Sequence, residues 1–374
     1  MVAASSRASW LAPRRTRTST RSWRTGISAS AGAGIHRALE LRPRDLEITL
    51  EEGREAETTD AIGIAGQLLE EGRLSDPFGR AIGTVSRLTC GRRDRHGVGM
   101  DMEFLPGVPA PALSGSVVGY TGFAQRAHGP VRFRELPCTY VPLILDLGEG
   151  WSIADARRPH TPPARLRSFV AGLTDGPVLV EHGGAARCLQ VDLTPLGARR
   201  LLGLPMSELA NRSVALEDVL GRDALALVER LADAPDWPAR FALVDRALGV
   251  RLAEARPIDA ATSWALGRVV ASGGRVAIGQ VARELGWSHR RLISRFRDGV
   301  GLAPKSVARI VRFERLIALV GAEPDVGWAR AAAGCGFFDQ AHLAREVRDL
   351  ADLTPTALRA ESVNSVQDRS AMGS

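Results

Sequence analysis

The sequence predicts an α+β protein in which a β-rich domain is followed by an all-helical domain. Three observations lead to this prediction. Between residues 111 and 195, short apolar or alternating runs are bounded by Gly and Pro, which is typical of strands and turns. Apolar residues then recur at helical spacing toward the C-terminus. In the last third of the chain, one helical pattern is repeated after 51 residues.

Length and composition are those of a globular protein. The 374 residues suffice for two or three domains, and 45% are hydrophobic and 24% charged. No apolar run reaches the roughly 18 residues that a membrane span needs, so we expect no membrane partner and a cytoplasmic location. The four cysteines, Cys90, Cys138, Cys188 and Cys335, show no C-x-x-C spacing. We therefore expect neither a metal site nor a cofactor.

The two ends of the chain differ in composition from the rest. Residues 1–38 contain seven arginines and no acidic residue, a composition found in transit peptides and in basic nucleic-acid-binding arms. The simpler expectation for residues 1–99 is disorder, or an extension before the natural start at Met100 or Met102. The polar tail over residues 361–374 is also expected to be disordered.

Residues 100–256 are expected to form the first folded domain. The runs "YVPLILDLG", "GPVLVEHGG" and "CLQVDLTP" are short candidate strands, and several such strands suggest a small barrel or sandwich. Helical patterns follow and run toward Arg256-Pro257, a candidate boundary. The helical domain is then expected over residues 257–360, with a first helix that stops at Gly273-Gly274.

The segment "VAIGQVARELGWSHRRLISRFRDGVG" has the pattern of a helix-turn-helix. Gly286 can supply the tight turn, and Ser288 can cap the second helix. Leu292 and Phe296 lie four residues apart and are expected to face the first helix. The opposite face then presents Arg290, Arg291, Ser294 and Arg297. Arginine can bind guanine or phosphate, although a basic amphipathic helix can also be only a solvated surface.

A second copy of this pattern makes the DNA-binding interpretation stronger. Leu343, Val347 and Pro355 repeat Leu292, Phe296 and Pro304 after 51 residues. Gly336 corresponds to Gly286, with one extra residue before the next cap, Asp339. Two such units on a connecting helix could enter successive turns of one DNA face, about 34 Å apart. Charge also clusters here, since residues 288–315 hold eight basic and two acidic side chains.

Residues 260–360 resemble the paired helix-turn-helix domain of the AraC/XylS family of bacterial transcription regulators. The matching segments are "VARELGWSHRRLISRFRDGVGLAP", "RIVRFERLIALV" and "AAAGCGFFDQAHLAREVRDLADLTPTALR". The resemblance implies base-contacting positions at Arg290, Ile293, Ser294, Arg297, Gln340, Ala341, His342 and Arg345. Ser288 and Arg291, at the start of the first recognition helix, complete the predicted DNA-binding set. The second unit departs from the family pattern at Val347, Asp352 and Leu358, which suggests looser packing.

The two units are not expected to contribute equally. In the second unit, Arg345 and Arg348 are accompanied by Glu346 and Asp349, which would balance their charge. We therefore predict that the first unit dominates affinity and base reading.

The resemblance also implies what the front domain does. Such regulators commonly carry a cupin-like sensor that binds a small-molecule effector, forms a homodimer, or both, and they recruit or block RNA polymerase; activation is the commoner role. Cys138, Trp151 and His182 are candidate effector-lining residues, although core packing or surface placement is the simpler expectation for each of them. We expect an association with the nucleoid.

Two other functions remain open from the sequence. The first is a constitutive DNA-binding protein whose front half only dimerises. The second is an enzyme fused to a DNA-binding tail, but the sequence contains no G-x-S-x-G, P-loop or H-E-x-x-H motif. The seven histidines are scattered, so we predict that the protein is not an enzyme.

Overall fold

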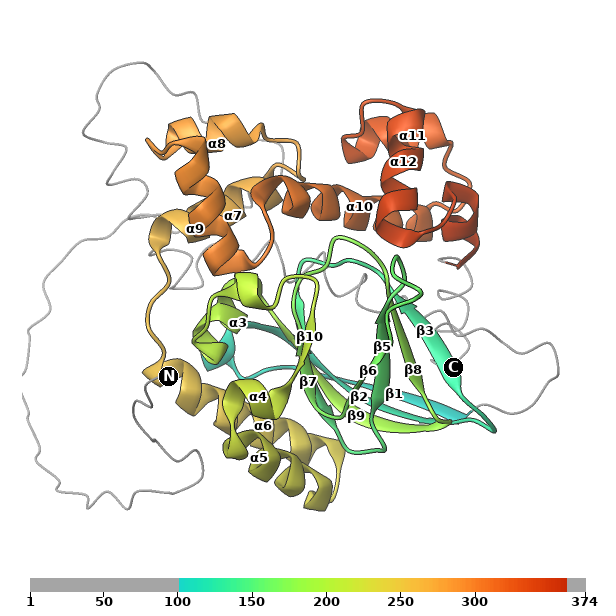
Figure 1. The fold of residues 1–374 in the computed structure, drawn as a ribbon, viewed down its shortest axis with the longest axis vertical. Coiled ribbons are helices and arrows are strands. Elements are labelled where there is room, and N and C mark those ends of the chain that lie inside the picture. The colour runs from blue at the N-terminus through green and yellow to red at the C-terminus, as the bar shows by residue number, and fades with distance from the viewer. Residues whose placement is uncertain (1–100, 362–374) are drawn as a thin grey trace, which may run out of the picture.

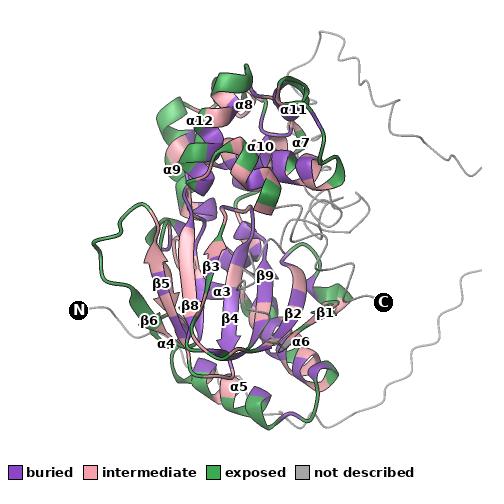
Figure 2. Cartoon of the chain, turned by 90° about the vertical axis from the view of Figure 1, so that its right-hand side faces the viewer, coloured by how far each residue is buried: buried purple, intermediate pink, exposed green. Residues whose placement is uncertain are grey.

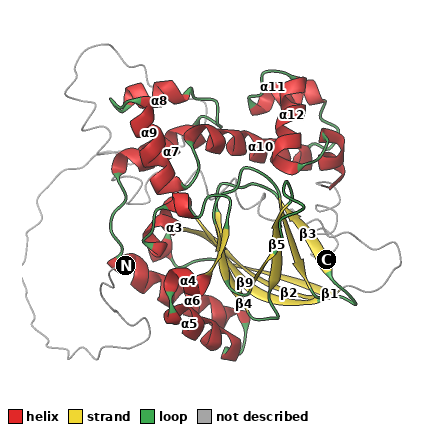
Figure 3. Cartoon of the chain, in the orientation of Figure 1, coloured by secondary structure: helices red, strands yellow, loops and turns green. Residues whose placement is uncertain are grey.

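The computed structural model describes residues 101–361 (Figure 1). The expectations for residues 1–99 and for the tail from residue 362 onward lie outside the described residues. Within the described part, a β-rich segment is followed by helices, which confirms the predicted fold class (Figure 3).

The β-rich part contains two antiparallel sheets. The larger sheet has the strand order β1-β2-β9-β4-β7-β10, and the smaller has the order β3-β8-β5-β6. The strands of the larger sheet are β1 Asp101–Gly107, β2 Val117–Arg126, β4 Val141–Asp146, β7 Phe169–Ala171, β9 Ala185–Leu193 and β10 Ser213–Ala215. Those of the smaller sheet are β3 Val131–Glu135, β5 Trp151–Asp155, β6 Ala164–Leu166 and β8 Val178–His182. The three quoted apolar runs are thus β4, β8 and β9.

Strand β4 shows why its sequence is a continuous apolar run. Leu143 and Leu145 are buried in the core that the larger sheet shares with the helices. Ile144 is buried on the opposite face, among residues contributed by both sheets. A strand that is covered on both faces has no reason to alternate with polar residues. The sequence left a small barrel and a sandwich open, and the structure shows two packed sheets, with one sheet-to-sheet core and one sheet-to-helix core (Figure 2).

Helices cover the outer face of the larger sheet. They are α3 Pro195–Leu202, α4 Leu216–Leu220, α5 Arg222–Asp233 and α6 Trp237–Glu254, with short 3₁₀ turns η1 Pro111–Leu113 and η2 Met206–Glu208. Helix α6 approaches β2 so closely that a Cβ on Gly122 would lie 2.6 Å from the Trp237 ring. The Tyr120 hydroxyl on β2 donates to Asp245 of α6 at 2.8 Å.

The C-terminal part consists of six labelled helices. These are α7 Ala260–Ala271, α8 Ile278–Glu284, α9 His289–Val300, α10 Pro304–Ala322, α11 Trp328–Cys335 and α12 Gln340–Ala351, and residues 355–361 are also helical. Gly273 and Gly274, with φ of 61° and 72°, follow α7 as predicted. Gly286 and Gly336, with φ of 63° and 84°, form the turns of the two helix-turn-helix units.

Candidate nucleic-acid interface

The first helix-turn-helix unit is formed by α8 and α9. After Gly286 reverses the chain, the Trp287 N–H donates to the Ala282 carbonyl at 2.9 Å. Ser288 is the N-cap of α9, and its hydroxyl accepts from the Arg291 N–H at 3.2 Å. The turn and the cap together fix where the recognition helix begins.

The inner face of α9 is buried and its outer face is free. Leu292 is 1% exposed and Phe296 is fully buried, as their spacing predicted. The exposed side chains of α9 are His289, Arg290, Arg291, Ser294, Arg295 and Arg297. Among the residues that the structure describes, none of these arginines forms an ion pair. Four guanidinium groups are therefore available to an anionic partner.

Two residues of α9 have more restricted surroundings. The Arg291 guanidinium lies over the Trp287 ring, 4.6 Å from its centroid, which directs it back toward the start of the helix. Ile293 is half-buried, between the core face and the exposed face. Its aliphatic side chain has no hydrogen-bonding group.

The second unit repeats this arrangement in α11 and α12. Asp339 is the N-cap of α12 and accepts from the His342 N–H at 2.6 Å. Gln340, Ala341 and Arg345 are exposed on the outer face. Leu343 and Val347 are fully buried on the inner face.

His342 differs from the other predicted contact residues because both of its ring nitrogens have partners within the protein. Nδ1 accepts from the Phe338 N–H at 3.1 Å, and Nε2 lies 3.3 Å from Glu346 Oε1. Because Nδ1 accepts, Nε2 carries the proton that is donated to the carboxylate. The Phe337 ring also contacts His342 edge-to-face at 5.7 Å. In this structure His342 braces the start of α12.

The acidic residues of α12 do not balance its arginines as the sequence suggested. Glu346 lies 2.7 Å and Asp349 lies 3.0 Å from the guanidinium nitrogens of Arg309 on α10. Arg345 and Arg348 are exposed and form no ion pair among the described residues. The sequence could not show which arginine the two carboxylates would meet, because Arg309 lies far from them along the chain.

The suggestion of a loosely packed second unit is not supported by the burial of the departing residues. Val347 is fully buried and Leu358 is 1% exposed, although both are smaller than the side chains usual in the family. Asp352 adopts the left-handed conformation, φ 56°, that a glycine normally provides at the end of a helix.

Helix α10 connects the two units, and two arginines join them further. Arg312 on α10 donates to the Gly274 carbonyl at 2.6 Å. Arg275, which follows α7, donates to the Gly334 carbonyl at the end of α11. The orientation of α9 relative to α12 is thus held by contacts as well as by the 19-residue helix, about 28 Å long.

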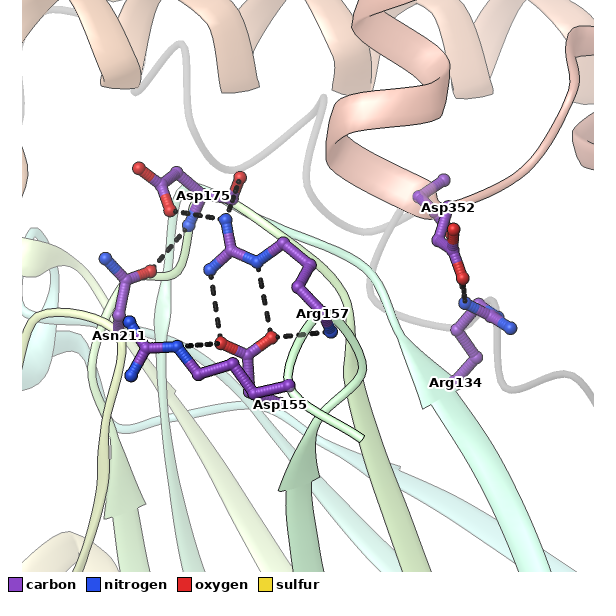
Figure 4. A network of polar contacts seen from close by, with 8 residues as sticks. Arg134, Asp155, Arg157, Asp175, Asn211 and Asp352 are labelled. Carbon is purple, nitrogen blue, oxygen red and sulfur yellow. Dashed lines mark hydrogen bonds and ion pairs between the residues drawn. The ribbon is translucent and has the colours of Figure 1, made fainter. Parts of the chain in front are cut away.

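The β-rich part touches the C-terminal ends of both recognition helices. Near α9, Arg199 of α3 lies 3.6 Å from Asp298. Near α12, Arg134 of β3 donates to the Ala351 carbonyl at 3.1 Å and lies 3.4 Å from Asp352 (Figure 4). A cation beside the last carbonyls of a helix is favourable.

We expect Arg134→Met to loosen the end of α12 by about 1 kcal/mol, because the hydrogen bond to the helix end is lost along with a weak, partly exposed ion pair. Hydrogen exchange of amides 348–352 measures this change. Asp352→Gly is the matched variant: it loses the ion pair but relieves the left-handed strain, so its effect should be smaller. Equal effects of the two substitutions would mean that the hydrogen bond from Arg134 to the end of α12 contributes nothing beyond the ion pair.

A third contact joins the β-rich part to the middle of α10. The Thr139 N–H and hydroxyl donate to the Glu314 carboxylate at 2.8 and 2.9 Å. Burial raises the pKa of Glu314 to about 7, against the opposing effect of the Thr139 hydrogen bonds. Cys138 lies beside this contact, and burial raises its thiol pKa well above the ordinary value.

The candidate effector residues fall in two places. Trp151 and His182 are both buried between the two sheets, with ring centroids 5.4 Å apart. His182 Nε2 is 2.8 Å from Gln125 Oε1, and burial lowers the histidine pKa. The Trp151 indole N–H donates to Asp146 at 3.1 Å. Cys138 is not part of this cluster, because it lies at the contact with α10.

Two absences apply to residues 101–361 only. No helix there is long and apolar enough to cross a membrane. No group of three or more His, Cys, Asp or Glu side chains in that range is placed so that it could hold a metal ion.

The comparison with protein families agrees with the helix-turn-helix geometry. Residues 281–361 match a family model described as a helix-turn-helix domain. No curated protein matches the chain. Among solved structures, ToxT from Vibrio cholerae is 10% identical, with 65% of this chain and 97% of that chain covered and a TM-score of 0.38. The AraC-like transcriptional activator CuxR is 15% identical, with coverage of 64% and 90% and a TM-score of 0.29.

The paired units, their exposed arginines and the matched family model define a DNA-binding protein with an AraC-type helix-turn-helix domain. This assignment covers residues 281–361, the part of the chain that the family model matches.

Proposed function

We propose that the protein is a sequence-specific regulator that reads two successive major-groove segments with α9 and α12. The observation that carries the proposal is the outer face of α9, where Ser294 and three arginines without an ion pair, Arg290, Arg291 and Arg297, lie opposite the buried Leu292 and Phe296. The same division of faces in α12, on a connected second unit, supports paired reading.

The proposed contacts fall into two kinds. Arg290 and Arg297 are free to bind guanine edges or phosphates, and Ser294 can reach either. Arg291 and Ser288 lie at the start of α9, and we assign them to contacts with the phosphate backbone of the DNA. Ile293, Gln340, Ala341 and Arg345 complete the base-facing set, while His342 can join it only by giving up a partner.

We assign DNA binding to residues 257–360, and sensing and dimerisation to residues 100–256. The effector would be small and largely apolar and would bind between the sheets, where Trp151 lies in an apolar cluster and His182 contacts it. RNA polymerase is the proposed partner at the promoter, and the chromosome the proposed location. A metabolite that binds the folded chain should raise its thermal midpoint.

A genome-wide binding footprint in the native host tests the proposal. We expect one shared motif with two boxes about one helical turn apart. Binding should weaken steeply with salt, because phosphate contacts release counterions. Uniform occupation without a motif would overturn sequence-specific reading.

We expect Arg290→Ala to weaken binding to such a site by about 1–3 kcal/mol and to relax the sequence preference in one box. Arg345→Ala should cost less, because α12 presents fewer free arginines than α9. Arg230→Ala removes an exposed charge from α5 and is the matched control. Titration of labelled operator DNA measures all three variants. A larger loss for Arg345→Ala would reverse the ranking of the two units.

A further inference from the structure

The turn of the second unit contains one residue more than the turn of the first. The Trp287 N–H donates to the Ala282 carbonyl, and the Phe337 N–H donates to the Ala332 carbonyl, both at 2.9 Å. These two aromatic residues are therefore equivalent. The cap follows Trp287 directly, but in the second unit Phe338 stands between Phe337 and the cap.

Phe338 is 92% exposed, whereas Phe337 is 5% exposed. Among the described residues, Phe338 is the most exposed of the large apolar side chains and the only aromatic one in that group. Single exposed apolar residues are common on proteins, so exposure alone does not assign a role. The position of this residue is what matters.

Phe338 lies at the N-terminal end of α12. In a helix-turn-helix this is the end of the recognition helix that contacts base edges. The residues that follow the cap, Gln340 and Ala341, are exposed beside it. An aromatic ring at this place would lie at the groove that α12 enters.

The backbone of Phe338 is held in place. Its N–H donates to His342 Nδ1, and the His342 ring is fixed in turn by Phe337 and by Glu346. The phenyl ring is thus presented from an ordered turn, which lowers the entropy lost on binding. This arrangement also gives His342 a task other than base reading.

We propose that Phe338 contacts the C5-methyl group of a thymine at the edge of the box that α12 reads. A phenyl ring can offer only apolar contact, and the thymine methyl is the apolar group of the major groove. The contact would add to the sequence preference that Gln340 and Arg345 are proposed to give α12. The inference rests on the proposed role of α12 as a recognition helix.

Binding of the full chain to a footprint-derived site tests this, with wild type, Phe338→Ala and Val108→Ala compared. Val108 is 90% exposed on the β-rich part and serves as the control. We expect Phe338→Ala to bind about tenfold more weakly, with the same dependence on salt, because no phosphate contact is lost. Val108→Ala should bind as wild type does.

Deoxyuridine, which lacks the C5-methyl group, identifies the contacted base. Replacing each thymine of the α12 box in turn should weaken wild type several-fold at one position and leave Phe338→Ala unaffected there. A deoxyuridine penalty that persists in Phe338→Ala would overturn the proposal. So would unchanged DNA affinity with reduced transcription, which would indicate a polymerase contact, or a lowered thermal midpoint, which would indicate packing.

Arg290→Ala, measured in parallel, separates this inference from the function it rests on. If Arg290→Ala loses affinity and Phe338→Ala does not, sequence-specific binding stands and only the role of Phe338 fails. If wild type shows no sequence preference, the proposed function itself fails.

Discussion

Phe296→Ala should destabilise the first helix-turn-helix unit by about 3–5 kcal/mol, the usual cost of removing a buried phenyl group. Phe296 is fully buried in the core where α9 packs on α7 and α8, together with Leu292 and Val281. The cavity left by the phenyl ring would not close, because the residues around it also pack against α10. Operator binding should be lost with the unit, since α9 would no longer present its arginines.

Hydrogen exchange of amides 278–300 in the full chain measures this loss directly, because it reports local as well as global opening. Arg295→Ala is the matched control: it lies next to Phe296 on the same helix, is exposed, and should change stability by less than about 0.5 kcal/mol. Phe296→Leu should fall between the two. Unchanged exchange in Phe296→Ala would show that α9 is held by something other than its inner face.

The helical domain could be predicted from the sequence because its signals are local. Leu292 and Phe296 lie four residues apart, Gly286 breaks the helix before them, and Ser288 caps the next one. Each signal needs only neighbours within a turn or two, and the copy 51 residues later repeats them. Burial and dihedral angles in the structure agree with each of these expectations.

For the β-rich part, the sequence predicted the fold class but not how the strands pair. Strand β9 lies between β2 and β4 in the larger sheet, and β8 lies between β3 and β5 in the smaller one. Such pairings join strands far apart along the chain, and no local spacing specifies them. The apolar runs therefore predicted strands without predicting which sheet each strand would join.

The partners of charged residues were the least predictable feature of the candidate site. Asp349 is adjacent to Arg348 in the sequence, yet it pairs with Arg309 on another helix. His342 matched a contact position of the family, yet both of its nitrogens are occupied within the protein. Which charged groups become partners depends on how the helices pack, and a single sequence does not specify that packing.

The contacts between the two parts of the molecule are equally long-range, and they have a functional consequence. Arg199 and Arg134 meet the ends of α9 and α12, while Thr139 meets α10 between them. A change in the β-rich part that moved these three groups would therefore alter how both recognition helices are presented. Thr139 and Glu314 form the central contact, and it is the one that contains a group with a strongly shifted pKa.

The pKa of Glu314 should make this contact depend on pH. Burial raises the pKa from 4.5 to about 7, so the folded state favours the protonated carboxyl. Because the folded pKa is the higher one, the stabilisation is fully present below about pH 4.5 and is lost as the pH rises through 7. Partial access of water reduces the effect, and we expect a loss on the order of 2 kcal/mol across this range.

Glu314→Gln should remove this dependence, because the amide keeps an acceptor for the Thr139 N–H but cannot ionise. The difference between the thermal midpoints of wild type and Glu314→Gln, followed from pH 5 to 8, isolates the carboxyl from the other titrating groups. Wild type should lose stability relative to the variant as the pH rises. Glu323→Gln, an exposed glutamate just after α10, should keep the wild-type profile.

Thr139→Val removes the hydroxyl that donates to Glu314 but leaves the carboxyl group in place. The Thr139 hydroxyl stabilises the carboxylate, so its removal should raise the pKa of Glu314 and move the loss of stability to higher pH. Identical pH profiles for wild type, Glu314→Gln and Thr139→Val would mean that Glu314 titrates normally and that α10 is not held through its carboxyl. A shifted profile would instead connect the position of the Thr139 loop with the helix that joins the two recognition units.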